Sequence, residues 1–535
     1  MSRVWLLLIS TFVCVLSACP QEPPDQPGYW KKALGKASSH SEKAIILGNL
    51  RKQKPQDASF LPLLHGILSE EKSPDVRVAA VRILADMRHA SSLGPLQNAL
   101  DFKASGAHTR DLNRAIAEAL VSLKASETEP VFLEMLKNKD AFTLFPAVEG
   151  LGQLRSRQAV PFLLEMLEDA ATPLNEQSKY ITALGQIADS SAIPVLEKKL
   201  FTRHLERDAA LALFRMGKPA ADALLLVLQE KNAALRKWAF ENKIPSEILM
   251  ANATSVLGDM QELRAENILI ARLTLASGRN DAYKLLRAQA INALGRMRSS
   301  KAPAALSRAV VELDAELRGL CVLALAQIGD KNALAALKTA STTGDFDERL
   351  RAMMGVALLG GEAELAFFNK QMDEERSLFG KELPRLKKEC GDSPSCDEQI
   401  KRLGEQRTEA LNQLKDILET GSKCEEKESC WAQVLVDVNA NSFKRQRAAF
   451  FLGRSKNPEH IAALGKQLMD ADLDLRMSSL LGLSWLISDV PSAAEQAKKL
   501  IQPMQQQMEE ERGRTQSLGV RDEMLRVLWT LQNLP

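Results

Sequence analysis

The sequence is poor in aromatic residues and has almost no excess of either charge. Aromatic side chains make up 5% of the 535 residues, and 70 Lys and Arg nearly balance 68 Asp and Glu. Because phosphate contacts require a basic surplus or a basic face, this balance argues against a nucleic-acid partner. The abundant residues are Ala, Leu, Glu, Lys, Arg and Gln, which favour helices over strands. The composition therefore predicts an all-α protein.

The usual signatures of catalysis are also missing. The six histidines are scattered, with no pair spaced i, i+4, and neither an HExxH motif nor a His-Glu dipeptide occurs. There is no P-loop, no GxSxG motif and no dinucleotide-binding fingerprint. We therefore expect no catalytic residue, no metal site and no cofactor.

The sequence has no apolar run long enough to span a membrane. Its longest apolar run is short and lies at the N-terminus. Arg3 precedes a largely apolar run from Val4 to Val15. These residues would span about 18 Å as a helix, less than the roughly 30 Å of a bilayer core, so the run predicts an export signal. The sequence Leu16-Ser17-Ala18-Cys19 resembles the bacterial lipobox. The resemblance implies removal of residues 1–18 and a lipid on Cys19, and the alternative is an ordinary signal followed by a chance cysteine.

A proline-rich segment follows the predicted anchor. Residues 19–28 contain four prolines, which favour an extended tether between the membrane and the folded body. In bacterial lipoproteins an aspartate after the cysteine is associated with retention in the inner membrane, and here Pro20 occupies that position. We therefore expect a lipid-anchored protein of the cell envelope, and the resemblance favours the periplasmic face of the outer membrane over the inner membrane.

The rest of the chain repeats one helical pattern. A first residue, often Arg, is followed by a small residue three later, a leucine seven later and an aliphatic residue ten later, as in Arg77, Ala80, Leu84 and Met87. Seven of the nine intervals between successive leucines of this pattern are 29 to 36 residues long. These offsets lie on one helical face, and a second apolar helix follows each pattern, so each unit is predicted to be a helical hairpin.

Such hairpins bury their apolar faces only by stacking into a right-handed superhelix. Asp75-Val76-Arg77-Val78-Ala79-Ala80 resembles the short HEAT-like repeats of bacteria, which are also found in phycobilisome lyases. The resemblance implies an all-α, HEAT-like α-solenoid, and says little about activity. The recurring arginines are expected to bond carbonyls and acids between adjacent repeats, and the alternative is that they form a row of ligand-binding side chains. The predicted segments are a signal peptide at 1–18, a tether at 19–28, repeats at 29–369 that are irregular near 235–280, a charged helical insertion at 370–430, and repeats with capping helices at 431–535.

The insertion contains two cysteine pairs, each with the spacing C-x5-C. Residues 397–419 have helical spacing and no proline, so they predict one long helix that separates Cys396 from Cys424. Because a disulfide requires Cα atoms within about 7 Å, the predicted bridges are Cys390–Cys396 and Cys424–Cys430. A four-thiolate zinc site is the alternative. Cys321 occupies the small-residue position of its repeat and is expected to be a buried free thiol.

Positions five and nine of the pattern should face the concave side of the solenoid. In the C-terminal half these positions are apolar and form a predicted strip of partner-binding residues, namely Leu323, Val356, Phe450, Leu481 and Trp485. Such a strip is larger than soluble monomers normally expose. The alternative is that the bridged insertion or the terminal helices cover it.

These observations predict a lipid-anchored scaffold that binds a protein or peptide partner along the concave surface of the solenoid. An envelope enzyme with a composite active site in the solenoid groove is the alternative function.

Cys19→Ser should abolish membrane association and leave a folded, soluble body, because no other segment is long and apolar enough to insert. The measurement is the share of protein in the membrane fraction after a high-salt wash. A variant that stays with the membranes would contradict the lipid assignment.

Overall fold

The structure is a computed structural model that describes residues 23–103, 106–273, 281–313, 315–391, 393–510 and 518–533. The predicted signal peptide, Cys19 and the first residues of the tether lie outside these ranges. The described residues form 29 α-helices and no strand, which confirms the all-α prediction. None of the described helices is long and apolar enough to cross a membrane. The chain divides into two units after Val195.

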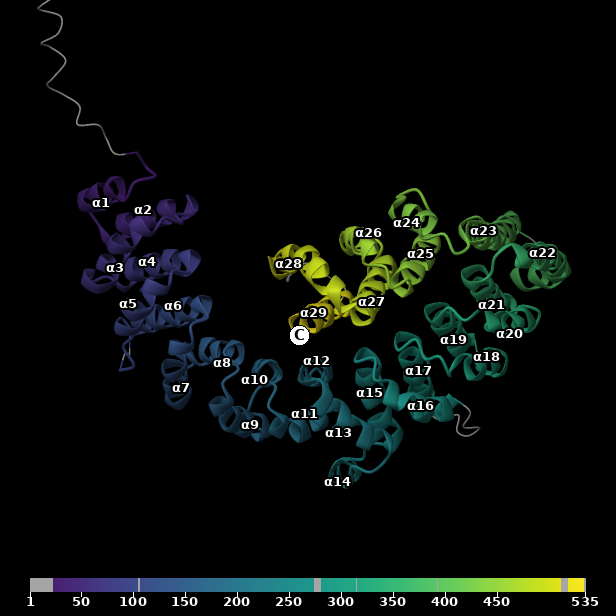
Figure 1. Ribbon diagram of the computed structural model, residues 1–535, viewed down its shortest axis with the longest axis horizontal. Helices are drawn as coiled ribbons and strands as arrows, with labels where there is room; N and C mark the ends of the chain where they lie inside the picture. The colour runs from purple at the N-terminus through teal and green to yellow at the C-terminus, as the bar shows by residue number, and fades with distance from the viewer. Residues whose placement is uncertain are drawn as a thin grey trace, which may run out of the picture. The chain divides into compact units, whose positions relative to one another are not determined.

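The first unit is a stack of helical hairpins in two layers (Figure 1). The inner layer consists of the helices that carry the repeated pattern and of one helix that precedes the first of them. Each inner helix packs against the next inner helix. The inner helices are α2 (His40–Lys52), α4 (Pro74–Met87), α6 (Ala107–Leu123), α8 (Leu144–Gln153) and α10 (Leu174–Ile187). The outer helices are α1 (Pro27–Lys36), α3 (Leu61–Glu70), α5 (Leu93–Asn98), α7 (Glu129–Asn138) and α9 (Val160–Glu168), and α11 (Ile193–Lys199) spans the division between the units.

Helix α4 shows why the pattern produces a hairpin. Its small residue, Ala80, and its leucine, Leu84, are fully buried. The helix ends at Arg88, which adopts a left-handed conformation that turns the chain toward the next outer helix. At its start the Nε of Arg77 donates a hydrogen bond of 2.9 Å to the carbonyl of Leu68 near the C-terminus of α3. A cation at this position bonds a carbonyl that has no partner within its own helix.

The second unit begins with an arm of the same construction, which we call the first arm. Its inner helices are α12 (Glu206–Met216), α15 (Ser246–Asp259), α17 (Asp281–Arg296), α19 (Ala315–Ile328) and α21 (Phe346–Leu359). Its outer helices are α13 (Lys218–Leu228), α16 (Glu266–Leu273), α18 (Pro303–Glu312) and α20 (Leu334–Ala340). An additional short helix, α14 (Ala233–Glu241), lies within the segment that the sequence marks as irregular. Cys321 is a buried free thiol, and burial raises its pKa to about 12.

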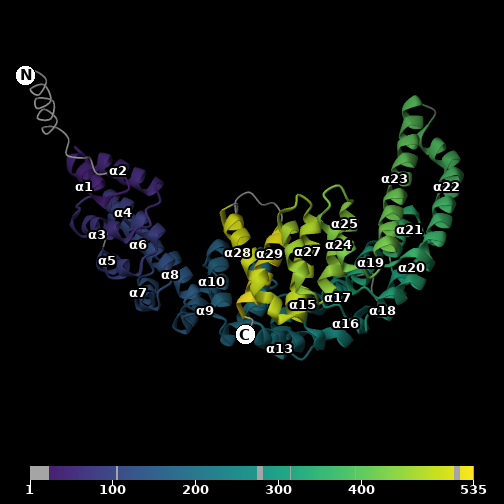
Figure 2. The ribbon, with the colours of Figure 1, turned by 45° about the horizontal axis from the view of Figure 1, so that its top comes forward.

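A long helical hairpin follows the first arm and extends past the neighbouring helices (Figure 2). It consists of α22 (Glu362–Cys390) and α23 (Pro394–Cys424), so it begins and ends earlier than the predicted insertion at 370–430. Helix α23 has 31 residues and carries Cys396 and Cys424 at its two ends. The disulfides join Cys390 to Cys396, with Cα atoms 5.7 Å apart, and Cys424 to Cys430, with Cα atoms 5.3 Å apart.

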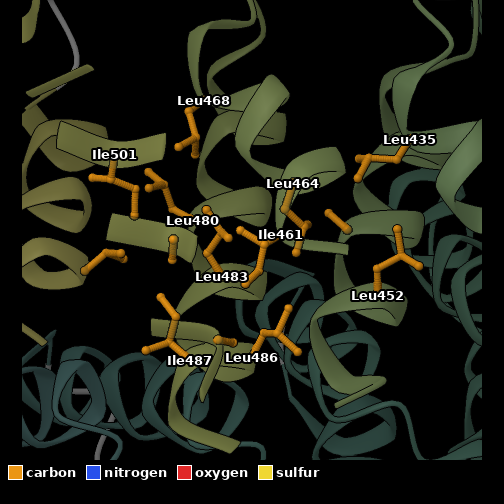
Figure 3. Close-up of a cluster of buried hydrophobic side chains, with 14 of the residues drawn as sticks. Leu435, Leu452, Ile461, Leu464, Leu468, Leu480, Leu483, Leu486, Ile487 and Ile501 are labelled. Atoms are coloured by element: carbon orange, nitrogen blue, oxygen red, sulfur yellow. The ribbon is translucent and has the colours of Figure 1, made fainter. Parts of the chain in front are cut away.

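The chain then forms a second arm with its own apolar core (Figure 3). Its inner helices are α25 (Ser442–Arg454), α27 (Leu473–Asp489) and α29 (Leu518–Asn533), and its outer helices are α24 (Glu428–Val436), α26 (Ile461–Lys466) and α28 (Ala494–Glu510). The second arm folds back, and its inner helices lie along those of the first arm (Figure 1). Helix α25 meets α19 and α21, and α29 meets α12. The second unit therefore fills its own inner side.

Hydrogen bonds from the second arm satisfy the C-terminal carbonyls of three consecutive inner helices of the first arm. Trp485 Nε1 donates to the carbonyl of Arg296 at 2.9 Å, at the end of α17. Arg454 donates to the carbonyls of Ala326 and Gln327, at the end of α19, at 2.9 and 2.8 Å. Arg447 bonds the end of α21, where it donates to the carbonyl of Gly360 at 2.6 Å. These donors occupy the negative ends of the helix dipoles.

Arg454 and Arg447, which cap α19 and α21, lie against glycine residues where any other side chain would clash with them. Gly329, with φ +81°, follows α19, and a Cβ there would lie 2.7 Å from the Arg454 guanidinium carbon. A Cβ on Gly421 would lie 2.2 Å from a guanidinium nitrogen of Arg447. Burial lowers the pKa of both arginines to about 10, and in Arg447 the charge of Arg454 adds to this effect.

A cluster of buried charges holds the last helix, α29, against the first arm. Glu523 accepts from Arg296 of α17 and from Arg526 of its own helix. Both arginines also pair with Asp259 of α15, at 3.1 Å in each case. Burial alone would raise the pKa of Glu523, but the two arginines outweigh burial and lower it to about 2. Nearby, Arg207 of α12 pairs with Asp522, so α29 contacts three inner helices through ion pairs.

Glu523→Gln should reduce the loss of stability that the protein suffers on acidification. The folded pKa of Glu523 is about 2, below its ordinary value of 4.5. Its contribution is therefore complete above about pH 5 and is lost as the pH falls toward 2, because the unfolded chain takes up the proton first. The measurement is the melting temperature between pH 3 and pH 7. Equal pH profiles for the variant and the unmodified protein would contradict the ionised cluster.

Candidate functional site

The predicted apolar strip is buried inside the second unit, which corrects its interpretation as an open partner-binding surface. Trp485 and Val356 are fully buried, and Phe450 and Leu481 are 3% exposed. The rings of Phe450 and Trp485 lie 5.8 Å apart, and Leu323 of the first arm packs against them. The structure thus brings together four of the five predicted residues, but as a contact between the two arms.

Helix α21, which carries Val356, packs against α23 of the bridged hairpin. Phe450, Leu481 and Trp485 have a different cover. It is the inner side of the first arm, because Trp485 bonds the end of α17 and the Arg298 guanidinium lies 5.4 Å from the centre of its ring. One signal in the sequence indicates this burial. Helix α27 has apolar or small residues on every side, and all of its residues from Ser478 to Ile487 are buried. A helix without a polar face belongs inside a protein rather than on a binding surface.

A contact between a histidine and a serine in the first unit resembles part of a catalytic pair. His65 Nε2 lies 3.0 Å from Ser92 Oγ, and burial lowers the pKa of His65. Ser92 is fully buried at the start of an outer helix, so its hydroxyl cannot meet a substrate. In the described ranges, no group of three or more His, Cys, Asp and Glu side chains could hold a metal ion.

The inner helices of the first unit present a face of exposed polar residues. We call it the first inner face and define it by its exposed members, which are Asp75, Arg82, Asp86, His108, Arg114, Glu118, Glu149, Gln153, Lys179 and Thr182. Four of them, namely Arg82, Glu118, Glu149 and Thr182, hold position five of the repeated pattern. The pattern therefore identifies the solvent-facing side of these helices, because the residues three and seven positions after its start are buried in the stack.

The first inner face carries both positive and negative side chains, and some of them form ion pairs with neighbouring residues. Asp75 Oδ1 lies 3.2 Å from His108 Nδ1, which joins α4 to α6. Arg114 pairs with Asp111 on α6 at 2.9 Å. These pairs are exposed and contribute little to stability. The structure shows no ion pair for Arg82 or Glu118 within the described residues, so both can pair with groups from another molecule.

Two half-buried aromatic rings add apolar area at one edge of this face. Phe142, just before α8, lies 4.4 Å from the Arg110 guanidinium and 5.7 Å from that of Arg114. Phe145, on α8, has Lys179 Nζ from α10 at 3.5 Å from its ring centre. Cations over aromatic faces hold both groups in place while their outer sides stay accessible. Rings and charges in this arrangement suit contact with a polypeptide.

Comparison with known proteins identifies the repeat. A family model described as HEAT repeats matches residues 104–178 and 271–357, one segment in each unit. The fold is a HEAT-like α-solenoid. A search of curated proteins found no significant match.

Several solved solenoids are similar in fold at low sequence identity. A Kap121p mutant is 11% identical with a TM-score of 0.43, and the match covers 89% of this chain and 62% of that chain. Importin beta is 14% identical with a TM-score of 0.36, covering 95% of this chain and 68% of the other. The CpcE and CpcF complex of phycocyanin lyase from Nostoc sp. PCC7120 is 16% identical with a TM-score of 0.23, covering 64% of this chain and 98% of that one. This chain thus spans about three fifths of Kap121p, and these likenesses concern the fold alone.

Phe450→Ser should lower the free energy of unfolding by about 3 to 5 kcal/mol, the usual loss for a buried aromatic side chain. The matched control is Phe443→Ser on the same helix, where the side chain is 38% exposed; its cost should stay below about 1 kcal/mol. Chemical denaturation of the two variants is the measurement. A small loss for Phe450→Ser would restore the open strip.

Proposed function

We propose that the protein is a lipid-anchored scaffold of the cell envelope and that its first inner face binds an extended segment of a protein partner. The observation that carries the proposal is the difference between the two units. The second unit fills its inner side with its own helices, whereas inner helices α4, α6, α8 and α10 keep charged and polar side chains exposed. Stacked hairpins commonly bind polypeptides on such faces.

The N-terminal sequence supports the location. The short apolar run and the lipobox-like sequence that ends at Cys19 favour export and lipid attachment. The proline-rich tether gives the folded body distance from the membrane. Disulfides persist mainly in oxidising compartments, so the bridges Cys390–Cys396 and Cys424–Cys430 favour the same location. Pro20 after the cysteine favours the outer membrane.

The chemistry of the first inner face favours a partner segment that carries both charges and at least one apolar side chain. Arg82 and Glu118 offer opposite charges on neighbouring helices. The cation-flanked rings of Phe142 and Phe145 offer apolar contact beside them. Charge complementarity of this kind contributes chiefly to specificity and to the rate of association.

The double variant Arg82→Glu with Glu118→Lys should reduce partner capture about tenfold, because it exchanges the two charges while the net charge stays the same. The measurement is the yield of a stoichiometric crosslinked adduct from intact envelopes. The matched control is Glu134→Lys with Lys137→Glu, a charge exchange on the exposed side of outer helix α7, which should preserve the adduct. Equal yields from the two double variants would contradict binding at the first inner face.

A further inference from the structure

The repeated pattern fails at one place in the first arm, and a pocket lies there. Helix α14 is an extra element between outer helix α13 and inner helix α15, and it lies at the outer edge of the second unit (Figure 1). It ends at Glu241, and α15 begins at Ser246 with Pro245 at its N-cap. Because proline disfavours helical geometry in the residue before it, the chain turns between the two helices. This turn separates α14 from the regular layers.

The pocket between α14 and the start of α15 has a volume of about 540 Å³. Phe240, Ile244 and Pro245 form its apolar wall. Phe240 is 85% exposed, the highest value for any large hydrophobic side chain in the described residues. A pocket next to an exposed aromatic side chain can take up an apolar group from another molecule and bury the ring against it.

The charged groups of the pocket are all positive. Arg236 and Lys237 belong to its lining, which contains no acidic residue. Among acids close in sequence, Glu230 pairs with Arg272 at 3.3 Å and Glu247 is hydrogen-bonded to Tyr283, while the exposed Glu241 ends α14 outside the pocket lining. The pocket thus combines an apolar wall with two exposed cations.

We propose that this pocket docks an acidic segment of a protein that places one large apolar side chain against Phe240 and carboxylates near Arg236 and Lys237. Charge complementarity specifies the acidic character of the segment, and the hollow beside Phe240 specifies the apolar side chain. A pocket is suited to one side chain that inserts into it. A membrane-binding surface instead presents several protruding apolar side chains on one face. This site lies in the second unit and is separate from the first inner face, so either can fail without the other.

The test uses a fluorescein-labelled peptide with one phenylalanine flanked on both sides by glutamates, and measures its fluorescence anisotropy with the full-length protein. The unmodified protein should bind it at least about tenfold more tightly than analogues with glutamine for glutamate or serine for phenylalanine. Phe240→Ser should weaken binding at least about tenfold, and so should Arg236→Glu with Lys237→Glu. Because all three side chains are exposed, these variants should keep the melting temperature of the unmodified protein.

Matched controls come from exposed residues elsewhere in the second unit. Phe443→Ser removes another accessible phenylalanine, and Arg308→Glu with Lys466→Glu reverses two exposed charges; both should bind the peptide normally. The proposal is overturned if the unmodified protein does not bind the peptide at millimolar concentration, or if Phe240→Ser binds it as tightly as Phe443→Ser. It is also overturned if Phe240→Ser weakens binding to phosphatidylglycerol vesicles but leaves peptide binding unchanged, because Phe240 would then contact membranes.

Discussion

The architecture depends on one interaction, the satisfaction of helix C-terminal carbonyls by cationic side chains. Within a hairpin, Arg77 bonds the end of the preceding outer helix, and Arg445 does the same for the carbonyl of Leu435. Between the arms, Arg447 and Arg454 bond the ends of α21 and α19. The carbonyls at the end of every helix need hydrogen-bond donors from outside the helix, and here several of these donors are arginines. The same chemistry therefore builds the single repeat and closes the second unit on itself.

The contact between the two arms also explains how the second unit tolerates buried charge. Arg447 and Arg454 have lowered pKa values because their guanidinium groups lie away from water and near each other or near Arg298. Carbonyl groups at helix ends partly replace the lost water, since they carry the negative end of the helix dipole. The apolar contact of Phe450, Leu481 and Trp485 lies beside these hydrogen bonds. Polar and apolar contacts thus support the same arrangement of the two arms.

The sequence predicts what is local and misses what joins distant segments. The hairpin repeat follows from residues within one pattern, and the disulfide pairing follows from the length of one straight helix, α23. The sequence also identifies Leu323, Phe450 and Trp485 as apolar residues that need cover. It does not say that they cover one another, because Trp485 meets a carbonyl 189 residues earlier and no repeated spacing encodes that contact. In the sequence, the pocket beside Phe240 corresponds only to a break in the repeated pattern near Pro245. The volume of the pocket and the exposure of Phe240 depend on how α14 and α15 are placed.

The contact between α12 and α29 changes how the second unit can fold. An open solenoid gains stability hairpin by hairpin, since each repeat touches only its neighbours. Here Arg207 pairs with Asp522, 315 residues later. This contact forms only after residue 522 has been synthesised, and contacts of such long sequence separation form slowly. The second unit is therefore expected to fold and unfold as one cooperative body, and the apolar inner sides of its arms stay exposed until α29 has been synthesised.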